Sequence, residues 1–176
     1  MGISSESAES RAVVVPFDEE FQAAFEQLNR EWIEAYFALE PADREILADP
    51  QGKILDSGGQ VFFVVDQGQV QGTCAVLRLG ADVCEIAKMA VAPAARGRGF
   101  GDLLMRACIA FAGEIGTRRI VIVSNTVLEP AIRLYRKHGF VEVPLATDPR
   151  YRRANIRLEL ELAPSALASS PEATGR

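Results

Sequence analysis

The chain has 176 residues, a length that fits one compact domain whose core needs no disulfide or metal to hold it together. Hydrophobic residues make up 48% and charged residues 24%, which excludes a wholly disordered, collagen-like or disulfide-framework protein. The net charge of −5 provides no overall field that would attract nucleic acid or an anionic membrane. Local groups must therefore hold any anionic ligand.

The two ends of the chain differ in composition from the rest. Residues 1–11 and 163–176 are rich in Ser, Ala, Glu and Pro and contain few large apolar groups, so we expect mobile tails around a working domain at 12–162. No apolar run approaches the ~18 residues of a membrane span, and the opening residues lack the apolar stretch of an export signal. We therefore expect a cytoplasmic protein with neither a membrane nor a nucleic acid as partner.

The three cysteines are predicted to be small core residues. Cys74, Cys84 and Cys108 each lie in an apolar stretch and show no Cys-x-x-Cys spacing. Their pattern predicts neither a disulfide framework nor a metal site, which suits a reducing compartment.

The first half of the chain is predicted to pass from helices into antiparallel strands. Asp18 is placed to cap an amphipathic helix whose apolar residues recur every three or four positions as far as Tyr36. Two later apolar stretches are joined by a short glycine-containing turn, as in a hairpin. The predicted elements are a strand at 13–15, helices at 18–36 and 41–48, and strands at 59–66 and 70–79.

The second half alternates strands and helices, which predicts a mixed α/β fold. The predicted elements are strands at 82–91, 119–124, 140–143 and 154–162, with helices at 99–115 and 129–138. The whole chain then contains about seven strands and four helices. No internal repeat is present, so tandem-array folds are excluded.

A glycine and arginine cluster separates the strand at 82–91 from the helix that follows it. Gly99 and Gly101 allow a backbone to approach a ligand closely, and the first N–H groups of the helix have no partner within it. A pyrophosphate here would gain several N–H hydrogen bonds, the helix dipole and two arginines. The cluster comprises Arg96, Gly97, Arg98, Gly99, Phe100 and Gly101.

Other interpretations of this cluster fit less well. A Rossmann fingerprint needs Gly-x-Gly-x-x-Gly, but the sixth position is Asp102 when counted from Gly97 and Leu104 when counted from Gly99. A P-loop would need Gly-Lys-Ser/Thr, and one short Arg-Gly copy before an apolar helix is not an RG-type tract. A plain structural turn is the remaining alternative.

Two motifs resemble those of a known family. Arg96-x-x-Gly99-x-Gly101 resembles the acyl-CoA pyrophosphate motif of the GCN5-related N-acetyltransferase (GNAT) superfamily, and residues 124–143 are similar to its other signature. The resemblance covers about 12–162, and Ser-Asn-x-x-Leu-x-x-Ala resembles bacterial members with unassigned substrates. It implies a mixed, centrally splayed sheet of about seven strands flanked by about four helices. The second signature is carried by Asn125, Ala131, Leu134, Tyr135, Gly139 and Phe140.

The resemblance also implies an activity and a cofactor site. The family transfers an acetyl group from acetyl-CoA to a primary amine, here of a small molecule or peptide, by direct attack in a ternary complex. The pantetheine arm lies between two splayed strands, which assigns Met89, Ala90 and Val91 as backbone partners and Asn125 and Ala131 to the same site. β-Augmentation gives this pairing a physical basis. A homodimer is a further expectation from the family.

Glu85 is the candidate general base, since it stands alone in an apolar strand and its offset from Arg96 resembles that of the glutamate in histone-modifying members. The alternative is a strand-edge or salt-bridged residue. Lys88 lies three residues further on, so it should face the opposite side of the strand and form no close pair with Glu85 unless a bulge intervenes.

Tyr135 is the candidate acid that protonates the CoA thiolate, as the family's tyrosine does, and the alternative is a tyrosine that only packs under the sheet. A backbone N–H near Met89 or Ala90 is expected to bind the oxyanion. His138 precedes Gly139 at a helix end, where a cation merely complements the dipole. No Ser or Cys has a recognisable histidine partner, so a covalent acyl-enzyme is disfavoured.

Substrate recognition is expected from the first two helices, with Trp32 and Tyr36, and from the turn before the last strand. The arginines at 150–153 either grip a substrate carboxylate or form a solvated charge run, and we expect the second. Two other functions stay open: a non-catalytic acyl-CoA sensor or interaction module, and an enzyme that transfers a longer acyl group.

Overall fold

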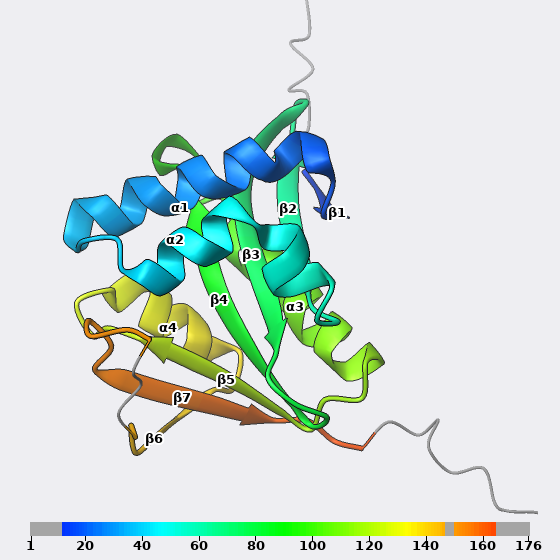
Figure 1. The fold of residues 1–176 in the computed structure, drawn as a ribbon, viewed down its shortest axis with the longest axis vertical. Coiled ribbons are helices and arrows are strands. Elements are labelled where there is room, and N and C mark those ends of the chain that lie inside the picture. Colours follow the sequence, from blue (N-terminus) through cyan, green and yellow to red (C-terminus); the bar gives the residue numbers. More distant parts are fainter. Residues whose placement is uncertain (1–11, 147–149, 165–176) are drawn as a thin grey trace, which may run out of the picture.

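A mixed β-sheet runs through the centre of the domain (Figure 1). The computed structural model describes residues 12–146 and 150–164. The strands cross the sheet in the order β1-β2-β3-β4-β5-β7-β6, and every neighbouring pair is antiparallel except β4 and β5. The strands are β1 (Val13–Pro16), β2 (Gln60–Asp66), β3 (Gln69–Arg78), β4 (Val83–Val91), β5 (Arg119–Ser124), β6 (Val141–Val143) and β7 (Ile156–Glu161).

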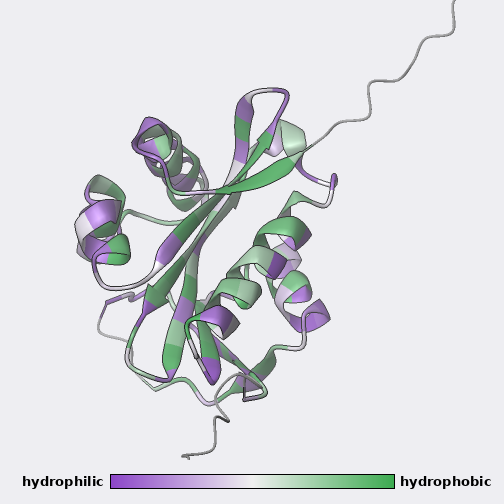
Figure 2. Ribbon diagram, turned by 90° about the vertical axis from the view of Figure 1, so that its right-hand side faces the viewer, coloured by the Kyte–Doolittle hydropathy of each residue, from purple (hydrophilic) through white to green (hydrophobic). Residues whose placement is uncertain are grey.

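Helices cover both faces of the sheet, and Figure 2 shows the sheet between its two helical layers. The helices are α1 (Gln22–Tyr36), α2 (Pro41–Ala48), α3 (Phe100–Glu114) and α4 (Glu129–Lys137). α1 and α2 enclose one apolar core, in which Phe25 and Leu47 join Phe63 of β2. α3 and α4 enclose the other, in which Leu104 and Ile132 join Ile120 of β5. The predicted α/β class is therefore confirmed.

Most predicted elements lie within two residues of the observed ones, and the start of the first helix is the main exception. Asp18 accepts a hydrogen bond from the Glu20 N–H at 2.9 Å, so it caps a short 3-10 turn at Glu19–Phe21 instead of α1 itself. A π-helical turn at Gln51–Leu55 was not predicted. The three cysteines are unpaired and buried, as expected.

A β-bulge interrupts β4 at Lys88. Thr73 pairs with Ala90 but Ala75 pairs with Ala87, so β4 holds one more residue than β3 across this stretch. Lys88 has a φ of 53°, in the left-handed region that a side chain rarely occupies. The extra residue reverses which side chains face each layer, and Lys88 reaches α2.

The parallel pairing of β4 and β5 ends soon after it begins. The register runs from Val83 opposite Arg119 to Glu85 opposite Val121 and stops there. β4 continues to Val91 and β5 to Ser124 without pairing with each other, so the sheet splays at its centre, as the family resemblance implied.

Gly59, next to β2, tests how tightly the sheet packs. A Cβ there would lie 2.2 Å from the Val76 carbonyl oxygen, so Gly59→Ala must displace backbone. We expect the unfolding free energy in urea to fall by about 2–3 kcal/mol. Gly80→Ala is the control, because its Cβ would meet nothing within 4 Å, and it should change stability by less than about 0.5 kcal/mol. Equal losses of unfolding free energy in the two variants would contradict the close packing of Gly59 against β3.

Candidate active site

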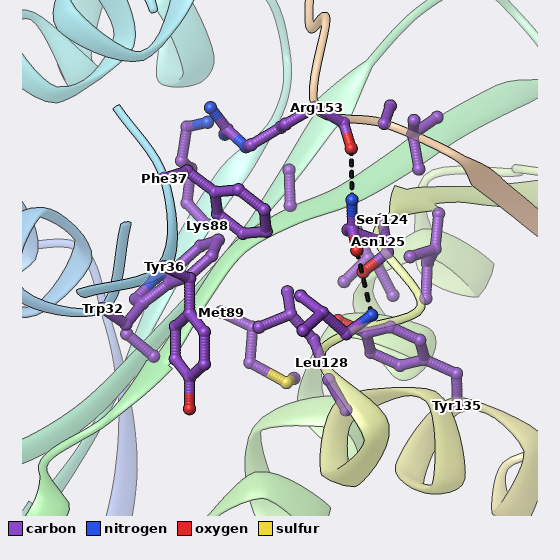
Figure 3. A pocket seen from close by; sticks show the side chains of 18 of the residues that line it. Trp32, Tyr36, Phe37, Lys88, Met89, Ser124, Asn125, Leu128, Tyr135 and Arg153 are labelled. Carbon is purple, nitrogen blue, oxygen red and sulfur yellow. Dashed lines mark hydrogen bonds between the residues drawn. The ribbon is translucent and has the colours of Figure 1, made fainter. Parts of the chain in front are cut away.

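A cavity of about 230 Å³ opens where β4 and β5 separate. Residues 85–91 of β4 form one wall, and residues 122–125 at the end of β5 form part of the facing wall. α4 contributes Tyr135 and α1 contributes Trp32 (Figure 3). The segment before β7 contributes Tyr151. The splayed strands thus open a space that helices from both layers complete.

The edge of β4 that faces β5 is unpaired along most of this cavity. Met89, Ala90 and Val91 all line it, while Ala90 and Val91 pair with β3 on the other edge. Backbone N–H and C=O groups on an unpaired strand edge can bind the amide groups of an extended ligand. The three residues that were predicted as backbone partners of pantetheine therefore all line the cavity.

The glycine-rich turn at residues 96–101 joins β4 to α3. Gly97 and Gly99 have φ values of 77° and 81°, and a Cβ at either would meet no atom within 4 Å, so backbone conformation and not crowding requires glycine. Gly99 is the N-cap of α3, whose first N–H groups lack intrahelical partners. A Cβ on Gly101 would lie 3.1 Å from Leu134 Cδ2, so this glycine permits the close approach of α3 and α4.

The two arginines of this turn have different surroundings. Arg96 is exposed and lines the cavity. Arg98 donates to Asp66 at the end of β2 (Nη2 to Oδ2, 2.7 Å), and its guanidinium lies 4.6 Å from the centroid of the Phe100 ring. Arg98 ties the turn to the sheet, and Arg96 is the arginine at the cavity itself.

Asn125 links the end of β5 to two neighbouring segments. Its Nδ2 donates to the Arg153 carbonyl oxygen at 2.6 Å, and its Oδ1 accepts from the Val127 N–H at 2.9 Å (Figure 3). Asn125 and Ala131 both line the cavity. Besides its predicted place beside pantetheine, Asn125 therefore holds the turn into α4 against the segment before β7.

Tyr135 presents a buried phenol to the cavity. The residue is 7% exposed, and its ring centroid lies 6.4 Å from that of Phe140. Burial raises the pKa of the phenol well above its usual range and nearby Cys74 adds to the shift, while a hydrogen bond with Ser124 opposes it. The Tyr135 hydroxyl therefore keeps its proton at neutral pH.

Glu85 is both buried and salt-bridged. The residue is 2% exposed, and its Oε2 accepts from Arg150 Nη2 at 2.8 Å. It also lines the cavity. Glu85 is therefore salt-bridged, as one interpretation of the sequence had it, and its side chain also lines the cavity where the other interpretation needs a base.

A buried ionic cluster connects the bulge of β4 with α2 and the segment before β7. The Lys88 Nζ donates to Asp43 Oδ1 at 2.7 Å and to the Tyr151 hydroxyl at 3.1 Å. Arg153 donates to both Asp43 oxygens at 2.6 and 2.8 Å and to Glu40 at 3.1 Å. Although the bulge intervenes, the partner of Lys88 is Asp43 and not Glu85, in line with the prediction that they form no close pair.

The charge of Asp43 depends on its two cations. Burial alone would raise the pKa of this carboxyl, but hydrogen bonds from Arg153 and Lys88 and the Lys88 charge lower it to about 2. Asp43 is therefore ionised at neutral pH. The expected solvated charge run at 150–153 was wrong for Arg153 and Tyr151, which line the cavity instead.

Three aromatic residues at the end of α1 line the cavity. Trp32 and Tyr36 were expected near the substrate, and Phe37 was not singled out in the sequence. His138 is the C-cap of α4, where its Nε2 lies 2.9 Å from Asp102 Oδ1, and it is not among the described residues that line the cavity.

This splayed fold occurs in solved acetyltransferases. The structure matches a GNAT-family acetyltransferase from Staphylococcus aureus Mu50 with a TM-score of 0.78 and 18% identity, covering 86% of this chain and 99% of that one. It also matches a phosphinothricin acetyltransferase from Sinorhizobium meliloti in complex with AcCoA, with a TM-score of 0.72 and 17% identity over 92% and 94% of the two chains. The chain therefore shares its fold with these structures.

Sequence comparison identifies the family. Residues 21–140 match the acetyltransferase (GNAT) family. The chain is 30% identical over 132 residues to the uncharacterized N-acetyltransferase C1271.07c of Schizosaccharomyces pombe, covering 72% of this chain and 78% of the relative. It is 29% identical over 122 residues to the uncharacterized N-acetyltransferase YjgM of Escherichia coli K12, covering 65% and 73%. The chain belongs to the GNAT family.

In the part of the chain that the structure describes, no helix combines the length and the apolarity that crossing a membrane requires.

The ionic cluster predicts a specific dependence of stability on pH. The folded pKa of Asp43 is lowered, so its contribution to stability is complete above its ordinary pKa of 3.8 and is lost as the pH falls through about 2. We expect the stability advantage of the wild type over Asp43→Asn to shrink by about 2 kcal/mol across this window. Urea unfolding at a series of pH values measures it. A difference that stays constant from pH 5 to pH 2 would contradict the assignment.

Proposed function

We propose that this GNAT-family protein is an acetyl-CoA-dependent N-acetyltransferase that moves an acetyl group to a primary amine by direct attack in a ternary complex. One observation carries the proposal: the unpaired edge of β4 and the buried side chain of Tyr135 line the same cavity. Thioester aminolysis needs a donor to the oxyanion and an acid for the leaving thiolate, and these two groups can supply them.

The proposed path of acetyl-CoA follows the cavity and the turn next to it. The pyrophosphate binds the N–H groups at the start of α3, where Gly97 and Gly99 open the backbone and Arg96 adds positive charge. The pantetheine amides pair with the free edge of β4 at Met89–Val91, close to Asn125. This orientation directs the thioester toward the bulge.

In the proposed reaction, the neutral amine nitrogen attacks the thioester carbonyl carbon, and the carbonyl oxygen becomes an oxyanion. A backbone N–H near Met89 or Ala90 stabilises that oxyanion. The C–S bond then breaks, and the CoA thiolate takes the proton of the Tyr135 hydroxyl as the amide forms. The proton lost from the amine goes to the base and is then returned, through solvent, to the Tyr135 phenolate, so charge and atoms balance and both groups regain their starting forms.

Glu85 is proposed as that base, directly or through water. Its carboxylate lines the cavity, but Arg150 occupies Oε2. A carboxylate has a second oxygen and further lone pairs, so it can accept the amine proton while Arg150 stays bound.

Tyr135→Phe tests the acid. The substitution keeps the ring packed and removes the proton donor, so we expect kcat to fall about 10²-fold or more. The Kd for acetyl-CoA, measured by calorimetry, should change less than about threefold, because the hydroxyl acts on the leaving group and not on cofactor binding. Unchanged turnover would remove Tyr135 from the proposed acid role. If the wild type binds acetyl-CoA but acetylates no amine, the acyl-CoA sensor is the better account.

Glu85→Gln tests the base. We expect kcat/KM at pH 7 to fall about 10²-fold, with a smaller loss above the pKa of the substrate amine, since a free amine needs no base to deprotonate it before attack. A pH series of initial rates for both proteins measures this. Parallel pH profiles for the two proteins would reject Glu85 as the base.

A further inference from the structure

Two hydrogen-bond donors in the cavity have no acceptor among the described residues. The Lys88 ammonium has three N–H groups, and Asp43 and Tyr151 accept only two of them. The Tyr151 oxygen accepts from Lys88, which leaves its own O–H to donate. Both side chains line the cavity, and both residues are less than 10% exposed. A ligand group that accepts several hydrogen bonds at once, such as a carboxylate, would satisfy both donors.

Ion pairs surround these donors. Among the described residues they join three anions to three cations, and Arg150 has a further interaction. The anions are Glu40, Asp43 and Glu85, and the cations are Lys88, Arg150 and Arg153. A ligand with charge of one sign would add a net charge to this largely buried group, which is costly. A zwitterion adds one charge of each sign and therefore no net charge.

The bulge places the side chains that would bind the two ends of such a zwitterion on one wall of the cavity. Ile86 packs into the core under α3 and α4, so its neighbour Glu85 faces the α1 and α2 side. In a regular strand Lys88 would face the other way, but the bulge turns it to Asp43 of α2. The proposed base and the spare ammonium donor therefore share a face, separated by two residues.

The remaining wall is apolar. Trp32, Tyr36 and Phe37 line the cavity from the end of α1, and the Phe37 ring lies 5.8 Å from the Arg153 guanidinium (Figure 3). Aromatic side chains that stand beside the charged group offer a surface for the apolar part of a ligand.

From these observations we propose that the acceptor is an α-amino acid with an apolar side chain. Lys88 and Tyr151 bind its carboxylate, Glu85 receives its amine, and the aromatic residues of α1 hold its side chain. This inference rests on the proposed N-acetyltransferase function and names the acceptor class of that site.

The test compares acceptors that differ only in the carboxylate. Full-length wild-type protein is assayed with acetyl-CoA by release of the CoA thiol. The acceptors are L-phenylalanine, L-leucine, L-methionine and L-tryptophan, each beside the amine that lacks its carboxylate, such as 2-phenylethylamine. Spermidine completes the panel as a polycation. We expect kcat/KM for the best amino acid to exceed that of its paired amine by about 10²-fold, as two charge-assisted hydrogen bonds can supply.

Tyr151→Phe then tests the contact itself. The ring stays in place, so we expect KM for the best amino acid to rise about tenfold while KM for its paired amine and for acetyl-CoA stays within about twofold. A purely structural role for the hydroxyl would shift all three constants together, and that result overturns the carboxylate contact.

The outcomes also separate this inference from the function it rests on. Transfer to the carboxylate-free amines or to spermidine with equal or greater efficiency overturns the amino-acid assignment and leaves the N-acetyltransferase intact. Transfer to no amine in the panel, with acetyl-CoA bound, overturns the assignment and counts against the enzyme as well.

Discussion

The bulge at Lys88 is the constraint on which the rest of the site depends. A lysine holds a left-handed backbone only when its surroundings compensate the strain, and here the ion pair with Asp43 and the hydrogen bond to Tyr151 do so. The bulge lies just beyond Glu85, where β4 and β5 stop pairing. Lys88 thus helps to shape the free strand edge that faces the cavity, and it also places an ammonium group beside Asp43 in the layer of α1 and α2.

The site has two regions in which the charges are arranged differently. At the glycine-rich turn, backbone N–H groups and Arg96 provide positive potential on a chain whose net charge is −5, so anion binding there is local. At the other end, ionised side chains are paired with one another, and Lys88 and Tyr151 each keep one hydrogen-bond donor that has no acceptor among the described residues. The first region suits a phosphate, and the second suits a ligand that carries both signs.

The sequence predicted those parts of the fold that follow from local pattern. Alternation, capping and glycine positions located the strands, the helices and the turn at 96–101, because each depends on neighbours in the chain. No local sequence pattern predicts the bulge. Lys88 lies in an apolar run that predicts a regular strand, and its φ depends on Asp43, which is 45 residues away. The same holds for Arg153, whose burial depends on α2 and whose sequence context is that of a surface charge run. Glu85 and Tyr135 were found from motif and position, and the residues that surround them required the tertiary structure.

The claim that acetyl-CoA occupies the opening between β4 and β5 is tested most directly by hydrogen–deuterium exchange with and without saturating acetyl-CoA. The account predicts slower exchange in peptides that cover residues 88–104 and 122–135, with no change at β1, which lies at the far edge of the sheet. Unchanged exchange in both segments under saturating ligand, or protection confined to other parts of the chain, would contradict it.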